Sequence, residues 1–191
     1  MSKLIVALGN PGNKYENTRH NIAWLTLDHL TITGELAWRD KFKGAYAEHT
    51  MTGNKVYFLK PQTYMNLSGE SVSSLVKFYK IEVNNILVLQ DEIDLMYGTV
   101  MFKNGGGLAG HNGLKSIAQC MGSQDFHRLR LGIGRPARGS VSSHVLSDFS
   151  GDEKIVLDQY LDAAAQAVET YVANGFEKAA NIYSKKNLIE V

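Results

Sequence analysis

Residues 3–12 read KLIVALGNPG, an apolar run that ends in a tight-turn sequence. A continuous apolar run without polar alternation is typical of a strand that is buried on both faces of a sheet. Gly9-Asn-Pro-Gly12 has the residue types that favour a turn directly after such a strand. A second run of the same character, NILVLQ, occupies residues 85–90. Two strands of this kind indicate a sheet that is covered by helices on both faces.

Helical and further strand patterns fill the rest of the chain. Apolar spacing predicts helices over residues 21–30, 68–79, 112–121, 151–174 and 176–186. Further strands are expected at residues 44–50, 55–60, 99–103 and 128–133. Gly34 is the expected C-cap of the first helix, Gly53-Asn54 the expected hairpin turn, and Ser150 with Glu153 the expected capping box of the long helix. The sequence therefore predicts one α/β domain over residues 1–191, a twisted mixed β-sheet flanked by helices on both faces.

Composition excludes several classes of protein. A chain of 191 residues with 44% hydrophobic and 20% charged residues can bury one sizeable core. No stretch approaches the eighteen or so apolar residues of a membrane span, and the short N-terminal run lacks a signal-peptide cleavage site. One cysteine excludes a disulfide framework, and its apolar neighbours predict that Cys120 is a core residue. We therefore expect a cytoplasmic protein.

Positive charge is concentrated in one part of the chain. The net charge is only +1, yet residues 103–138 contain six basic residues and a single acid, Asp125. The basic residues are Lys103, Lys115, Arg128, Arg130, Arg135 and Arg138. Such a cluster can bind an anion such as a phosphate backbone, and the alternative is an ordinary solvated surface.

Residues 105–110 read GGGLAG and match the G-x-G-x-x-G pattern of dinucleotide-binding loops. The context does not fit, because the next expected strand ends in Gly134-Arg135 without an acid for a ribose hydroxyl. A P-loop is also excluded, since His111-Asn112 follow where Lys and Ser or Thr are required. We therefore expect no nucleotide cofactor, and a backbone nest that can bind a phosphate or a carbonyl group.

The usual nucleophile and metal patterns are missing. The sequence has no G-x-S-x-G elbow. No two of the six histidines are four residues apart, as in a helical zinc site. The sequence therefore predicts neither a serine nucleophile nor a bound metal.

His20 is the candidate for acid–base chemistry. It closes the loop that follows the first strand, where a lone histidine is more often structural than catalytic. A carboxylate partner would favour catalysis, and Asp91 is the first residue after the run 85–90. A His–Asp pair without a serine or cysteine implies a base that acts on water. Amide side chains near the same strand ends can donate to carbonyl or oxyanion oxygens; these are Asn10, Asn66 and Asn112.

Five separate parts of the sequence resemble bacterial peptidyl-tRNA hydrolases, in order and over essentially the whole chain. They are GNPG (9–12) with Tyr15 and TRHN (18–21), KPQTYMNLSG (60–69), DEIDL (91–95), KNGGG (103–107) with GHNGLK (110–115), and FHRLRLGIG (126–134). This family cleaves the ester that joins a peptide to tRNA. The resemblance implies hydrolysis of N-blocked peptidyl-tRNA by a monomer without cofactor or metal, with tRNA as the partner.

The resemblance also implies roles for individual residues. His20 is then the base, Asp91 its partner, and Asn10 a contact to the peptide. Asn66 and Asn112 hold substrate and water, and Tyr15 and Tyr64 line the region of the tRNA 3′ end. Met65, Lys103 and Arg130 complete the expected substrate-binding and tRNA-binding residues.

Two positions depart from the family pattern. Tyr64 stands where many members have Phe, and it keeps a flat ring for stacking. Met96-Tyr97-Gly98 replaces a frequent Pro-Pro-Gly, which leaves the conformation of that loop open.

Two other functions compete with this interpretation. An RNA-binding relative that had lost catalysis would show a damaged His20, Asp91 or Asn10, and all three are present. A nucleoside-processing enzyme with a similar sheet is disfavoured by the full set of motifs.

Overall fold

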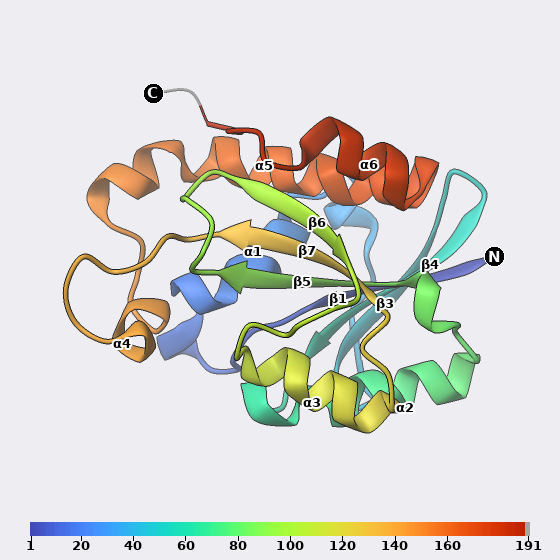
Figure 1. The fold of residues 1–191 in the computed structure, drawn as a ribbon. Coiled ribbons are helices and arrows are strands. Elements are labelled where there is room, and N and C mark those ends of the chain that lie inside the picture. Colours follow the sequence, from blue (N-terminus) through green and yellow to red (C-terminus); the bar gives the residue numbers. More distant parts are fainter. Residues whose placement is uncertain (190–191) are drawn as a thin grey trace.

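The computed structural model, which describes residues 1–189, contains a seven-stranded sheet (Figure 1). The spatial order of the strands is β2-β3-β4-β1-β5-β7-β6. Their bounds are β1 Ser2–Ala7, β2 Arg39–Lys41, β3 Gly44–Met51, β4 Asn54–Pro61, β5 Ile86–Glu92, β6 Val100–Asn104 and β7 His127–Gly132. The pairs β1–β4, β1–β5 and β5–β7 are parallel, whereas β2–β3, β3–β4 and β6–β7 are antiparallel. The sheet is therefore mixed, as predicted.

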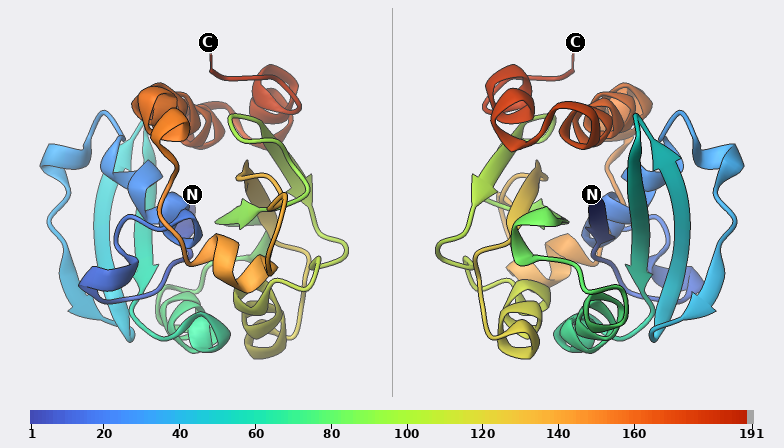
Figure 2. Two further views of the ribbon diagram at one scale, coloured as in Figure 1. Left: turned by 90° about the vertical axis from the view of Figure 1, so that its left-hand side faces the viewer. Right: turned by 90° about the vertical axis from the view of Figure 1, so that its right-hand side faces the viewer.

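Helices cover both faces of this sheet (Figure 2). The bounds are α1 Ile22–Asp28, α2 Ser68–Tyr79, α3 Asn112–Met121, α4 Val141–Val145, α5 Gly151–Asn174 and α6 Phe176–Tyr183. One face packs against α1, α5 and α6, and the other packs against α2 and α3. The prediction of a single α/β domain with helices on both faces is confirmed. No helix among residues 1–189 is both long and apolar enough to cross a membrane.

The central strand β1 explains the opening apolar run. Ile5 and Ala7 belong to the core under α1, α5 and α6, whereas Leu4 and Val6 belong to the core under α2 and α3. All four side chains are fully buried. Because both faces of the strand are covered, apolar residues occupy successive positions instead of alternate ones.

Most predicted strand bounds differ from the observed ones by one residue, and two differences are larger in their effect. Met51 pairs with Asn54, so the hairpin turn is Thr52-Gly53 and not Gly53-Asn54. Both turn residues have positive φ, as in the turn type whose twist matches a tight hairpin. Strand β5 continues through Asp91 and Glu92, because β7 still pairs with it there. Asp91 is therefore inside the strand and not beyond its end.

The ends of two helices were also predicted wrongly. Gly34 is not the C-cap of α1, which ends at Asp28, and it lies in a separate 3₁₀ turn, Thr33–Glu35. Helix α6 ends at Tyr183, because the chain then turns to meet β6. There the Ser184 hydroxyl accepts from the Phe102 amide at 3.0 Å, and the Lys185 amide donates to the Val100 carbonyl at 2.8 Å.

Cys120 is exposed on α3, so the prediction of a core residue is wrong. Helix α3 buries only the side formed by Gly113, Leu114, Ser116 and Ile117. The apolar neighbours of Cys120 in the sequence therefore belong to that buried side, and Cys120 does not.

Candidate active site

A cleft of about 380 Å³ lies at the carboxyl ends of β1 and β5. Its lining residues are Asn10, His20, Met65, Asp91, Glu92, Ile93, Ala109, Gly110, His111, Asn112, Val141, Ser142, Val145 and Leu146. The carboxyl ends of parallel strands are where open α/β sheets bind their ligands. Five residues predicted for the site therefore meet in this cleft: Asn10, His20, Met65, Asp91 and Asn112.

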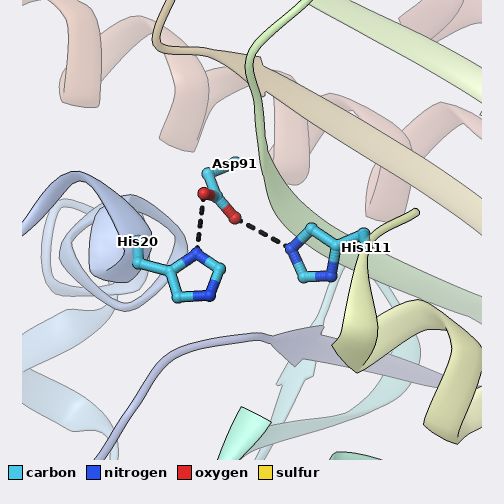
Figure 3. Close-up of side chains that lie close together, drawn as sticks. All are labelled: His20, Asp91 and His111. Carbon is cyan, nitrogen blue, oxygen red and sulfur yellow. Dashed lines mark hydrogen bonds and ion pairs between the residues drawn. The ribbon is translucent and has the colours of Figure 1, made fainter. Parts of the chain in front are cut away.

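Asp91 lies between two histidines (Figure 3). Its Oδ2 is 2.7 Å from Nδ1 of His20, and its Oδ1 is 2.9 Å from Nε2 of His111. Asp91 is 5% exposed, and the rings of His20 and His111 are largely covered. Figure 3 shows that the second ring nitrogen of His20, Nε2, points away from Asp91.

The hydrogen-bond partners of His111 assign its tautomer. His111 is the N-cap of α3, and its Nδ1 lies 3.1 Å and 3.4 Å from the amides of Gly113 and Leu114. An atom that accepts from amides carries no proton, so the proton is on Nε2 and is donated to Asp91. The sequence does not indicate a role for His111. The only signal was its place before a helix, where a side-chain acceptor is favoured.

Charge and burial shift the pKa values of the His20–Asp91 pair in opposite directions. Burial lowers the pKa of His20, but the charge and hydrogen bond of Asp91 outweigh it and leave this pKa raised. Burial raises the pKa of Asp91, but the charge of His20 and the hydrogen bonds from His111 and His20 hold it well below its usual range. Asp91 is therefore an anion that orients the ring and stabilises its protonated form.

A different set of contacts fixes Asn10. The side chain of Asn21 accepts from the Asn10 amide at 2.8 Å and donates to the Asn10 carbonyl at 2.9 Å. Oδ1 of Asn10 in turn accepts from the Met65 amide at 3.1 Å. No described residue accepts from Nδ2 of Asn10, so this group is a free donor at the cleft.

His20, Asp91 and His111 are also of the residue types that bind metal ions, and their ligand atoms lie within 4.8 Å of one another. The argument from histidine spacing did not foresee this group, because its members come from three separate segments. The nitrogens that face Asp91 are already paired with its two oxygens. A metal ion bound between these nitrogens and Asp91 would therefore have to replace both hydrogen bonds.

The remaining residues predicted for the substrate lie outside the lining of the cleft. Tyr64 is 67% exposed and directly precedes Met65, and Asn66, which follows Met65, is also exposed. Tyr15 is half-buried in the turn Asn13–Tyr15, with Nζ of Lys14 4.8 Å from the centre of its ring.

The basic residues of β6 and β7 differ in their burial and in their partners. Arg128 is 1% exposed and donates to the carbonyls of Gly105, Gly106 and Gly107, so it holds the glycine loop and does not face solvent. The hypothesis that Arg128 contacts phosphate is wrong for this reason. Lys103 is half-buried beside it, and its Nζ also donates to the Gly107 carbonyl, at 3.4 Å. Arg130 pairs with Glu92 at 2.6 Å.

Comparisons with known proteins agree with this fold and identify the family. The family model described as peptidyl-tRNA hydrolase matches residues 4–190. The peptidyl-tRNA hydrolase of Geotalea uraniireducens is 45% identical over 188 residues, 98% of each chain, and that of Desulfitobacterium hafniense is 46% identical over 184 residues, 96% of this chain and all of its own. The crystal structure of the Acinetobacter baumannii peptidyl-tRNA hydrolase matches with a TM-score of 0.90 at 37% identity, covering 97% of this chain and 96% of that one. The chain therefore belongs to the peptidyl-tRNA hydrolase family and is an enzyme of that type.

Proposed function

We propose that this protein hydrolyses the ester bond between a peptide, or an N-blocked aminoacyl group, and tRNA. The observation that carries the proposal is the His20–Asp91 pair in the cleft, with Nε2 of His20 directed away from Asp91. Asp91 holds the proton of His20 on Nδ1, which leaves a lone pair on Nε2 to accept a proton. This arrangement suits a base that activates water.

The reaction follows from that base. His20 takes a proton from water, and the resulting hydroxide oxygen attacks the ester carbonyl carbon. The carbonyl oxygen becomes an oxyanion, for which Nδ2 of Asn10 and the side chain of Asn112 are the available donors. The bond from carbon to the ribose oxygen then breaks, and His20 returns its proton to that oxygen. The products are a free peptide and free tRNA.

The tRNA is bound by groups around the cleft. Lys103 and Arg130 contact phosphates, Tyr15 and Tyr64 receive the 3′ end, and Asn66 and Met65 contact the reacting ester region. The whole of residues 1–191 acts as one catalytic domain, a cytoplasmic monomer that needs neither metal nor cofactor.

Incubation with N-acetylated and unblocked aminoacyl-tRNA tests the function. The N-acetylated ester should be hydrolysed and the unblocked one should persist, because the unblocked ester lacks the N-acyl carbonyl to which Nδ2 of Asn10 can donate. Tight tRNA binding without release of the acyl group would favour the competing hypothesis of an RNA-binding protein.

Asn10 provides a prediction about the oxyanion or peptide contact. Asn10→Ala removes the free donor Nδ2, which leaves a buried polar group of the substrate unpaired. The expected loss in kcat/KM is about tenfold to a hundredfold, or 1–3 kcal/mol. Asn10→Asp is the matched variant, because it keeps the acceptor for the Met65 amide and lacks the donor. Recovery of activity in Asn10→Asp would show that only the anchor to Met65 matters.

Lys103 provides a prediction about tRNA binding. If it contacts one phosphate, Lys103→Ala should reduce the magnitude of the slope of log affinity against log salt by about 0.7–0.9. Lys178→Ala, an exposed lysine on α6 across the sheet, is the control and should leave the slope unchanged. Equal slopes for all three proteins would remove Lys103 from the tRNA interface.

A further inference from the structure

The segment that joins β7 to α5 is largely exposed to solvent. Ile133 and Phe149 at its ends are 1% and 3% exposed, yet none of residues 134–148 is buried. We call this segment the strap; it contains α4 and lies beyond the carboxyl ends of β5 and β7 (Figures 1 and 2). A segment with so few buried apolar contacts has low local stability, so its polar contacts decide where it sits.

The strap forms one wall of the cleft. Val141, Ser142, Val145 and Leu146 line the cleft. Val141 and Leu146 are 40% and 41% exposed, so much of their apolar surface is open. Apart from Ser142, this wall of the cleft is therefore apolar.

Arg19 ties the second half of the strap to the body of the protein. Its guanidinium donates to the Ser147 hydroxyl at 2.6 Å, to the Asp148 carbonyl at 2.7 Å and to Glu153 at 2.7 Å. The Arg19 amide also donates to the Ser147 carbonyl at 3.0 Å. The side chain is only 9% exposed, so these contacts are shielded from water and worth more than surface contacts.

Contacts with the loop that follows β5 fix the first half of the strap. The Gly134 amide donates to the Leu95 carbonyl at 2.9 Å, and Arg135 pairs with Asp94 at 2.7 Å. The ring of His144 in α4 bonds to the carbonyls of Ile133 and Gly134, and a backbone bridge joins Thr18 to Asp148. Among the side chains outside the strap, Arg19 makes several contacts to its second half, and it directly precedes His20 in the same 3₁₀ turn, Arg19–Asn21.

We propose that Arg19 is a positioning residue that sets substrate specificity. By fixing the strap it places Val145 and Leu146 against the amino-acid side chain next to the ester, so large apolar side chains at that position are bound better than small ones. This proposal rests on the proposed function. It assigns Arg19 no contact with the reacting atoms.

Steady-state kinetics of two substrates measure this selectivity. Arg19→Met should raise KM for N-acetyl-phenylalanyl-tRNA by about tenfold, with little change in kcat and little change for N-acetyl-glycyl-tRNA. Leu146→Ser removes part of the wall and leaves Arg19 intact, so it should give the same pattern. The double variant should be no worse than either single variant, because both act on one wall. Equal losses in kcat for both substrates, or additive effects, would overturn the proposal.

Limited trypsin digestion measures the tether without any catalysis. Arg138 is exposed in the strap, and cleavage after it should be faster in Arg19→Met than in the wild type. Ser147→Ala removes one of the Arg19 contacts by changing an exposed residue of the strap, so the fold should be preserved. It should also make cleavage after Arg138 faster. Unchanged cleavage in both variants would refute the tether. An inactive wild type would refute the proposed function and the selectivity, while the digestion would still decide whether Arg19 holds the strap.

Discussion

His20→Ala should lower kcat for an N-acetylated aminoacyl-tRNA by about a hundredfold or more, while affinity for uncharged tRNA changes little. The variant removes the nitrogen that accepts the proton of water and leaves Lys103 and Arg130 in place. Turnover and tRNA affinity should be measured on the same preparation. His29→Ala is the matched control, because His29 pairs with Asp162 outside the cleft and should not affect either value.

The pH profile of the wild type checks the same role. A base must be neutral, and the pKa of His20 is raised above its usual value of 6.5 by Asp91. Activity should therefore be full at alkaline pH and fall as pH drops through a value above 6.5. Undiminished turnover in His20→Ala would remove this residue from catalysis, and joint loss of turnover and tRNA affinity would make it a structural residue.

Asp91→Asn should also lower kcat about a hundredfold, because Asp91 is hydrogen-bonded to both His20 and His111. A carboxylate accepts from both rings, whereas a carboxamide has one oxygen and one NH₂ group. The tautomer of His111 is held by the amides of Gly113 and Leu114, so the amide oxygen should face His111. The NH₂ group then faces Nδ1 of His20, which must give up its proton to Nε2. A protonated Nε2 cannot accept a proton from water.

A second substitution tests this explanation. In Asp91→Asn with His111→Asn, the oxygen at position 91 is free to turn to His20, and activity should partly return. Asparagine at position 111 still provides an N-cap for α3. The residual activity should show its acid limb at lower pH than the wild type, because burial then lowers the pKa of His20 without the opposing charge. A double variant no better than Asp91→Asn would contradict the tautomer argument.

Those parts of the molecule that follow from local pattern could be predicted from the sequence. The apolar runs of β1 and β5 predicted a sheet covered on both faces. The meeting of His20 and Asp91 could also be predicted, because both lie near the carboxyl ends of these neighbouring strands. The extra residues of β5 could not be predicted, since Asp91 and Glu92 are polar and are kept in the strand only by pairing with β7.

Features that depend on tertiary contacts could not be predicted in this way. Charge alone assigned Arg128 to the surface, but three carbonyls of the glycine loop satisfy its guanidinium in the interior. The strap has no periodic pattern, and its second half is held in part by Arg19, more than a hundred residues earlier in the chain. His111 donates to a carboxylate on another segment, which no spacing rule reveals.

The chain that turns back after α6 to meet β6 has a consequence for biosynthesis. Strand β6 is one of the two edge strands, and Ser184 and Lys185 bond to two of its outward backbone groups. These residues follow every strand in the sequence, so a nascent chain whose sheet has already assembled still presents an open edge to other chains. Open edges template intermolecular strand pairing, which leads to aggregation. Solubility during synthesis therefore depends on how soon Ser184 and Lys185 reach β6. The opposite edge is protected earlier, because its edge strand β2 is short and consists of three charged residues, Arg39–Lys41.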